Sequence, residues 1–131
     1  MSIVTPDCGE VRLLGWALNN VTQQNQTLKL FVNDVTPDDD TVVGDFTECT
    51  ATGYAAKTLT KGSWTVATAV GVTSATYATQ TFTITALTAD CYGYYVIDAN
   101  AGTLLWCERF SSSEPLYAGK SISIVPYIEL T

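Results

Sequence analysis

The chain has 131 residues, which is enough for one domain to bury a core without the help of a disulfide or a metal. Six basic residues stand against thirteen acidic ones, the formal net charge is −7, and histidine is absent. These properties argue against binding to DNA or RNA, because the scattered basic residues form no cluster that could neutralise phosphates. They also exclude catalytic groups and zinc sites that need a histidine.

Threonine is dense between residues 41 and 88, whereas Lys, Glu and Arg are scarce throughout. This composition favours strands over long surface helices, so we expect an all-β fold in a single domain over residues 1–131. The opening segment MSIVTPDCGEVR has no basic region followed by an apolar run, so we expect no secretory signal and folding in the cytoplasm. Residues 62–89 carry no charge, but Thr and Ser interrupt them, which indicates strands and not a membrane-spanning helix.

In the first half of the chain, alternating apolar and polar positions predict strands separated by polar loops. The predicted strands cover residues 11–16, 28–32 and 55–59, and loops are expected at residues 19–26, 33–45 and 46–54. In the loop at 33–45, Pro37 and the run of Asp residues after it rule out a central strand. No helix is expected.

The second half is predicted to consist of strands joined by short turns. After a turn at Lys61-Gly62-Ser63, strands are expected at residues 64–72, 80–86, 92–97, 104–110 and 121–130. Pro126 interrupts the last of these, because proline cannot donate to the hydrogen-bond ladder, and it indicates an edge or a bulge.

The segment from Tyr92 to Phe110, YGYYVIDANAGTLLWCERF, is the clearest feature and reads as a β-hairpin. Both arms alternate with a period of two, and residues 98–102 supply Asp, Asn and Gly for the turn. Aromatic and β-branched side chains occupy both faces of the arms, so we expect both faces to be covered. Pairing symmetric about Asn100 would place Cys91 opposite Arg109 and Cys107 opposite Gly93.

The four cysteines, Cys8, Cys49, Cys91 and Cys107, lack the paired spacing of a zinc ribbon. A disulfide between Cys91 and Cys107 would need a register shift of two residues. For a chain folded in the cytoplasm we expect reduced, partly buried thiols.

About eight strands with regularly spaced turn signals predict an antiparallel two-sheet β-sandwich, and we favour a jelly-roll-like arrangement over an immunoglobulin-like one. An immunoglobulin domain would show Cys, Trp and Cys in order, with Tyr two residues before the second Cys. Cys49, Trp64 and Cys91 imitate this order, but Ala89 stands where the Tyr would be.

Carboxylates are the main candidates for chemistry. Asp45 with Glu48, and Glu108, could serve as acids or bases, but we favour solvated or ion-paired carboxylates, and we expect no enzyme and no cofactor. Asp34 and the run Asp38, Asp39 and Asp40 could offer oxygens to calcium. Because the spacing of a calcium-binding helix-loop-helix is missing, we assign no metal, and calcium remains an alternative to a hydrated loop.

The three tryptophans and seven tyrosines raise the alternative of a carbohydrate- or receptor-binding surface. Their alternation with aliphatic residues favours burial in a core or an interface. Tyr54, after a glycine, and Trp64, after a turn, are the candidates for exposed residues of an interaction surface.

Five segments stand out together, and they are LKLFVNDVTPDDDTVVGDFTE (28–48), GYAAKTL (53–59), TFTI (81–84), the hairpin at 92–110 and GKSISIVPYIEL (119–130). Taken together, these segments resemble small virion proteins of tailed bacteriophages. The resemblance implies a capsid cement or decoration protein, which would clamp the joints between major capsid subunits, or a knob or fibre piece that faces the host. It implies as partners the major capsid protein and further copies of the chain, with a trimer favoured by analogy with other jelly rolls. The capsid, the neck and the fibre remain alternative positions in the virion.

Overall fold

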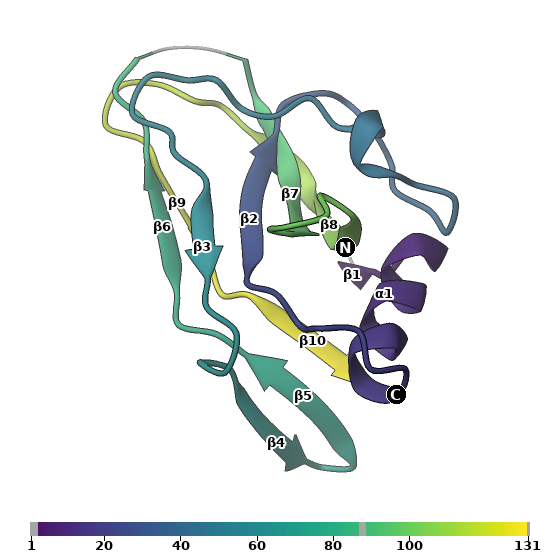
Figure 1. The fold of residues 1–131 in the computed structure, drawn as a ribbon. Coiled ribbons are helices and arrows are strands. Elements are labelled where there is room, and N and C mark those ends of the chain that lie inside the picture. Colours follow the sequence, from purple (N-terminus) through teal and green to yellow (C-terminus); the bar gives the residue numbers. More distant parts are fainter. Residues whose placement is uncertain (1–2, 87–88, 131) are drawn as a thin grey trace.

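The computed structural model describes residues 3–86 and 89–130, which form a mostly β structure with antiparallel sheets of five, three and two strands (Figure 1). The prediction of an antiparallel β-rich fold is therefore confirmed. The three separate sheets do not amount to a clear two-sheet jelly roll, and a helix is present where none was expected.

The described residues contain ten strands, one α-helix and one 3-10 turn. In chain order these are β1 Ile3–Val4, α1 Asp7–Leu18, β2 Gln26–Phe31, η1 Val43–Asp45, β3 Lys57–Leu59, β4 Thr65–Ala69, β5 Val72–Thr76, β6 Gln80–Thr83, β7 Cys91–Asp98, β8 Leu104–Glu114, β9 Ser121–Ile124 and β10 Tyr127–Leu130.

The five-stranded sheet has the order β1-β8-β7-β2-β3 and is built around the predicted hairpin, which forms β7 and β8. The predicted register was wrong by two residues at the centre of the hairpin. Gly93 pairs with Arg109 and Cys107 with Tyr95, while beyond an irregularity near Gly93, Cys91 pairs with Glu114. The turn shifts because Asp98 receives hydrogen bonds from the backbone N–H groups of Asn100 and Ala101, which tightens one side of the loop.

Both faces of this sheet are buried, as the aromatic content of the hairpin predicted. One face packs against the β6–β9 sheet, through a cluster that includes Leu30, Val96 and Phe82. The opposite face carries Phe31 and Tyr95, which pack on Phe46 from the long loop after β2. The sheet is therefore covered on both faces, by the β6–β9 sheet on one side and by the long loop after β2 on the other.

Helix α1 corrects the prediction of a strand at residues 11–16. Pro6 is its N-cap residue and Asp7 and Glu10 lie in its first turn, where acidic side chains favour a helix. Gly9, Leu13 and Trp16 recur at helical spacing and face inward. Gly9 lets the helix lie directly on β8, since a Cβ atom there would collide with the carbonyl group of Leu105.

Strands β4 and β5 correct the prediction of one continuous strand at residues 64–72. The chain reverses at Val70 and Gly71, which both have positive φ values, of 50° and 79°. A two-residue turn with this geometry fits the twist of a hairpin, but valine rarely adopts it, so the sequence carried a weak turn signal. The two strands project from the lower end of the molecule as a hairpin (Figure 1).

The strand predicted at residues 121–130 is divided at Pro126 between two sheets. β9 pairs with β6, and β10 pairs with β5. The clean alternation around β6 is confirmed, because Phe82 and Ile84 are buried while Thr81 and Thr83 are exposed. The predicted strand at residues 55–59 is shorter than expected, since only Lys57–Leu59 pair with β2.

The four cysteines are free, as predicted, and Cys49, Cys91 and Cys107 are buried. Burial raises the pKa of Cys91 and of Cys107 to about 12 in each case.

Because the thiolate is the nucleophile, we expect iodoacetamide at pH 8 to label these two residues only after unfolding. Peptide mass spectrometry with and without urea measures this. Rapid labelling of Cys91 in native buffer, or an intact mass that rises on reduction, would contradict the expectation.

Candidate functional site

A hollow lies where α1, the start of β4, β5, β8 and β10 approach one another. We call it the indole pocket. Its volume is about 330 Å³, and the residues that line it are Leu13, Trp16, Gln23, Gln26, Gly62, Trp64, Val66, Ala75, Trp106 and Ile128. A volume of this size is at the lower end of the range for small-molecule sites.

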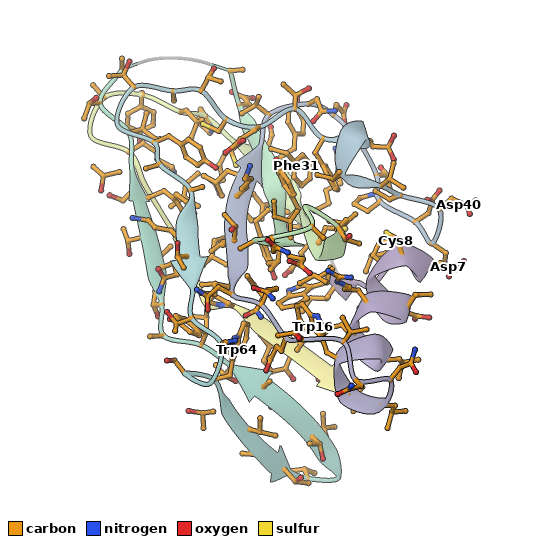
Figure 2. All side chains as sticks on the ribbon, in the orientation of Figure 1. Asp7, Cys8, Trp16, Phe31, Asp40 and Trp64 are labelled. Carbon is orange, nitrogen blue, oxygen red and sulfur yellow. The ribbon has the colours of Figure 1, made fainter. Side chains whose placement is uncertain are left out.

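All three tryptophans of the chain line this pocket, and each comes from a different element. Trp16 lies on α1, Trp64 directly precedes β4, and Trp106 lies on β8. The rings of Trp64 and Trp106 meet edge to face, with centroids 5.8 Å apart. Figure 2 labels Trp16 and Trp64, which both line this pocket. Residues 90 positions apart in the chain thus share one aromatic wall.

The polar groups of the pocket differ in whether they have partners. The indole N–H of Trp64 donates to Gln26 Oε1 at 2.9 Å, and the Gln26 amide donates to the carbonyl of Gln24. The indole nitrogens of Trp16 and Trp106 are buried and have no hydrogen-bond partner among the described residues. Both nitrogens are enclosed by the surrounding side chains and are not exposed to the space of the hollow.

None of the described residues that line the indole pocket is ionisable. The Lys61 ammonium donates to the carbonyl of Gln23, a lining residue, at 3.0 Å. A second hollow of about 410 Å³ shares Leu13 and Ile128 with the indole pocket and includes Glu10 and Glu129. The indole pocket is thus neutral and largely apolar, with a few polar groups.

Beside these hollows, α1 exposes apolar side chains to solvent. Val11, Leu14 and Leu18 are 73%, 59% and 82% exposed and follow one another at helical spacing. Leu130, at the end of β10, is also exposed and lines the second hollow with Leu14. We call Val11, Leu14 and Leu18 the apolar stripe. Exposed apolar residues arranged in this way mark surfaces that other molecules cover.

The β4–β5 hairpin, which we call the hairpin arm, is the second exposed feature of this end. β4 is the edge strand of its sheet, and all five of its residues are exposed. The arm contains no charged residue, and Val70 at its tip is fully exposed. Native proteins protect edge strands with charges, prolines or bulges, and β4 has no charge or proline.

Of the two residues predicted for an interaction surface, Trp64 lies in the indole pocket and Tyr54 lies elsewhere, in a packed position. The Tyr54 ring stacks on Phe82 with centroids 5.5 Å apart, and its hydroxyl donates to Glu48 and accepts from the backbone N–H of Leu30. Burial, with the nearby Glu48, raises the pKa of Tyr54. Both residues are partly buried, and their part in an interaction surface stays a prediction.

The sequence had no means of finding Trp16 and Trp106 as partners of Trp64, because the pocket is formed by chain segments that meet only in the fold. The glycine and turn that precede Tyr54 and Trp64 indicated loops, and a loop residue can still pack inward.

The carboxylates that were weighed for catalysis lie apart and have partners. Glu48 pairs with Lys29 at 3.0 Å, Asp45 receives the backbone N–H of Val42, and Glu108 receives the Tyr94 hydroxyl at 2.8 Å. These contacts agree with the interpretation of Glu48 as an ion-paired carboxylate.

The carboxylates of the loop at residues 33–45, which we call the acidic loop, bond to other residues of the chain. Asp38 receives the Thr41 hydroxyl and the backbone N–H of Asp40, and Asp34 pairs with Arg109 at 2.6 Å. Residues 3–86 and 89–130 contain no group of three or more Cys, Asp or Glu side chains that could hold a metal ion.

Comparison with models of protein families finds no match to this chain, and a search of curated proteins finds no similar sequence. Within the described ranges, no helix is long and apolar enough to cross a membrane.

Proposed function

We propose that this chain is a structural protein of a bacteriophage virion, a capsid cement or decoration protein that binds across the boundaries between major capsid subunits. Its partners in this proposal are the major capsid protein and further copies of itself, in a trimer, and it acts without a cofactor or a reaction. It would be made in the host cytoplasm and become part of the particle. The sequence segments that resemble tailed-phage virion proteins motivate the proposal.

The hairpin arm is the observation that carries the proposal. An exposed edge strand offers unpaired backbone N–H and C=O groups, and another chain can satisfy them by adding a strand. Because the arm has no charge while the chain carries −7, the arm can approach another acidic subunit with little repulsion. A projecting, uncharged strand pair is suited to reaching over a subunit boundary.

The apolar stripe on α1 supports the same function. Burying three aliphatic side chains that water now surrounds would release free energy of about 1.5–3 kcal/mol for each. Many copies that each make such a contact strengthen a shell by multivalent binding.

The finer description of the fold belongs to this proposal as well. We propose that the β6–β9 sheet and the β4–β5–β10 sheet together represent the second layer of a distorted jelly-roll-like sandwich, with the five-stranded sheet as the first layer. The shared cluster of Leu30, Val96 and Phe82 supports this relation.

Two experiments test the function. Mass spectrometry of purified particles should detect the chain, and particles that lack it should lose their DNA at lower temperature or lower salt than complete particles. The absence of the chain from particles, or unchanged resistance without it, would refute a cement function.

A matched pair of variants tests the hairpin arm. Ala67→Lys places a charge on the exposed edge strand, and we expect it to reduce binding to chain-free particles about tenfold or more, because lysine blocks strand addition. Thr83→Lys places the same charge on an exposed position of β6 and should bind normally. Equal binding by both variants would show that the arm makes no contact.

A further inference from the structure

We infer that the hairpin arm pairs with the arm of a second copy of this chain. The two β4 strands pair about a two-fold axis, and Val70 of each copy packs against the indole pocket of the other. The inference rests on the proposed function only in taking β4 as the strand to which another chain adds. It names that chain, and trimers on a shell could be joined to one another by the same two-fold contact.

The backbone of β4 offers its free hydrogen-bonding groups at two residues. Ala69 and Val72 flank the turn of the arm and are the pair that a two-residue turn closes with hydrogen bonds. Bonded and non-bonded pairs alternate along an antiparallel ladder, so the N–H and C=O groups of Thr68 and Val66 point away from β5. The hydroxyls of Thr68 and Thr73 lie 2.7 Å apart, which agrees with the closer spacing of a non-bonded pair.

One register lets a second β4 strand satisfy all of these groups. When two antiparallel copies pair about an axis at Ala67, Val66 of each copy lies opposite Thr68 of the other, and both residues are bonded in both copies. A register shifted by two residues would place Val66 or Thr68 opposite itself. The other residue would then face a position outside β4, which covers Thr65–Ala69.

The same register brings the tip of one arm to the base of the other. Val70 follows Ala67 by three residues and Trp64 precedes it by three, so Val70 of the second copy lies opposite Trp64. Directly opposite residues of an antiparallel pair share a face. Trp64 and Val66 both line the indole pocket, so the valine arrives on the face that carries the pocket.

Val70 itself is unusual for its place, which supports a contact there. Its φ value is 50°, which a β-branched residue rarely adopts, and its side chain is fully exposed. Asn, Asp or Gly would suit this turn position better and would leave no apolar side chain in water. A strained residue of this kind points to a function for its side chain. In the paired arms the side chain leaves water and meets an apolar lining.

Charge explains how two copies can meet although each carries −7. The hairpin arm contains no charged residue, and none of the described residues that line the indole pocket is ionisable. The arm also projects from the end of the molecule, so paired arms keep the acidic remainder of the two copies apart (Figure 1). A strongly charged partner would gain no opposite charge on this surface.

The position of the axis gives the main test, because Ala67 would lie opposite itself. Ala67→Lys and Ala67→Glu each place like charges across the axis, so each variant alone should be monomeric, whereas their equimolar mixture should form a mixed dimer. Sedimentation equilibrium measures this, and the unaltered chain should dimerise reversibly below about 1 mM. Thr83→Lys carries its charge on an exposed position of β6 and should dimerise as the unaltered chain does.

A second variant separates the contact from the fold. Val70→Asn replaces the apolar side chain by one that accepts a positive φ, so the Tm of the monomer should not fall, while the dissociation constant of the dimer should rise about tenfold or more. In a mixture of labelled and unlabelled unaltered chain, isotope-filtered NMR should show contacts between Val70 methyl protons of one copy and the Trp64 ring of the other.

Several results would overturn the inference. They are a chain that stays monomeric up to about 1 mM, a dimer that Ala67→Lys leaves intact, a charge mixture that stays monomeric, and a dimer without contacts between Val70 and Trp64. A monomeric chain whose Ala67→Lys variant still fails to bind particles would assign the arm to the capsid protein instead. The virion proposal is judged separately, because a dimer in solution does not depend on whether purified particles contain the chain.

Discussion

Replacing Gly93 by Ala is expected to lower the stability of the fold by about 3 kcal/mol, which corresponds to a fall in Tm of about 10 °C for a chain of this length. Gly93 lies in β7 between β2 and β8. A Cβ atom there would lie 2.6 Å from Cε1 and 2.7 Å from Cζ of Phe31, and it would also collide with the carbonyl oxygen of Glu108. Neither neighbour can move easily, because Phe31 is fully buried and the carbonyl belongs to a paired strand.

Gly44→Ala is the matched control for this prediction. A Cβ atom at Gly44 would meet nothing within 4 Å, and the backbone there does not have a positive φ. Thermal unfolding followed by circular dichroism measures both variants. If Gly93→Ala melts within a degree or so of Gly44→Ala, then β7 does not approach Phe31 and β8 as closely as the structure has it.

Replacing Asp98 by Asn is expected to cost about 2–3 kcal/mol at neutral pH. The Asp98 side chain is fully buried at the end of β7 and accepts three hydrogen bonds. It binds Arg12 of α1 at 2.7 Å and the backbone N–H groups of Asn100 and Ala101 at 2.8 and 3.0 Å. An Asn side chain would turn a donor towards Arg12 and leave the guanidinium without its counter-charge.

The effect of this substitution should depend on pH in a definite direction. Burial acts to raise the pKa of Asp98, but the N–H groups of Ala101 and Asn100 and the Arg12 guanidinium outweigh it and hold the pKa below its usual value. A lowered pKa in the folded state means that the charge contributes stability above the pKa of the unfolded chain, and that the contribution is lost as pH falls through the folded pKa. The difference between the unaltered chain and Asp98→Asn should therefore be constant from pH 7 to about 5 and shrink below about pH 4.

Urea denaturation at several pH values measures this difference. Asp39→Asn removes a charge from an exposed position of the acidic loop and should change the free energy of unfolding by less than about 0.5 kcal/mol at every pH. A difference for Asp98→Asn that stays constant down to pH 2 would show that the charge of Asp98 does not contribute to stability.

Both predictions concern the hairpin at residues 92–110, which the sequence identified most clearly. Its alternation and turn residues were sufficient to predict two strands with both faces covered, because a period of two requires only local information. Its register was not predictable, because the bonds from the turn to Asp98, the contact with Arg12 on α1 and the irregularities along the pair set it. The same limit applies to Cys91 and Cys107. Their reduced state was predicted from the expectation that the chain folds in the cytoplasm, but the residues opposite them in the hairpin, Glu114 and Tyr95, were not predicted.

Helix α1 is the largest error of the sequence-based interpretation, and its cause is physical. Residues 11–16 alternate well enough for a strand, but Gly9, Leu13 and Trp16 also recur with the spacing of a helix. Docking on β8 decides between the two patterns, since Gly9 permits a close approach that only the helix uses. Pro6 with Asp7 and Glu10 was the available signal for a helix start.

The indole pocket, even more than the register of the hairpin, is formed by residues that lie far apart in the sequence. Trp64 was identified from its position after a turn. The pocket also contains Trp16 from α1 and Trp106 from β8, and Trp64 itself lies in the loop before β4. The unpaired state of two indole nitrogens is a property of the packed structure and leaves no trace in residue order.

Composition, charge and local periodicity were enough to predict a β-rich, acidic, histidine-free chain with antiparallel strands, because each of these properties follows from residue type or from nearest neighbours. Only the tertiary structure shows how the layers are arranged and how β7 pairs with β8. It alone also shows the helix and the indole pocket. Each of them is set by contacts between residues far apart in the chain, and a close approach such as that of Gly93 to Phe31 or Gly9 to Leu105 exists only once those segments are packed.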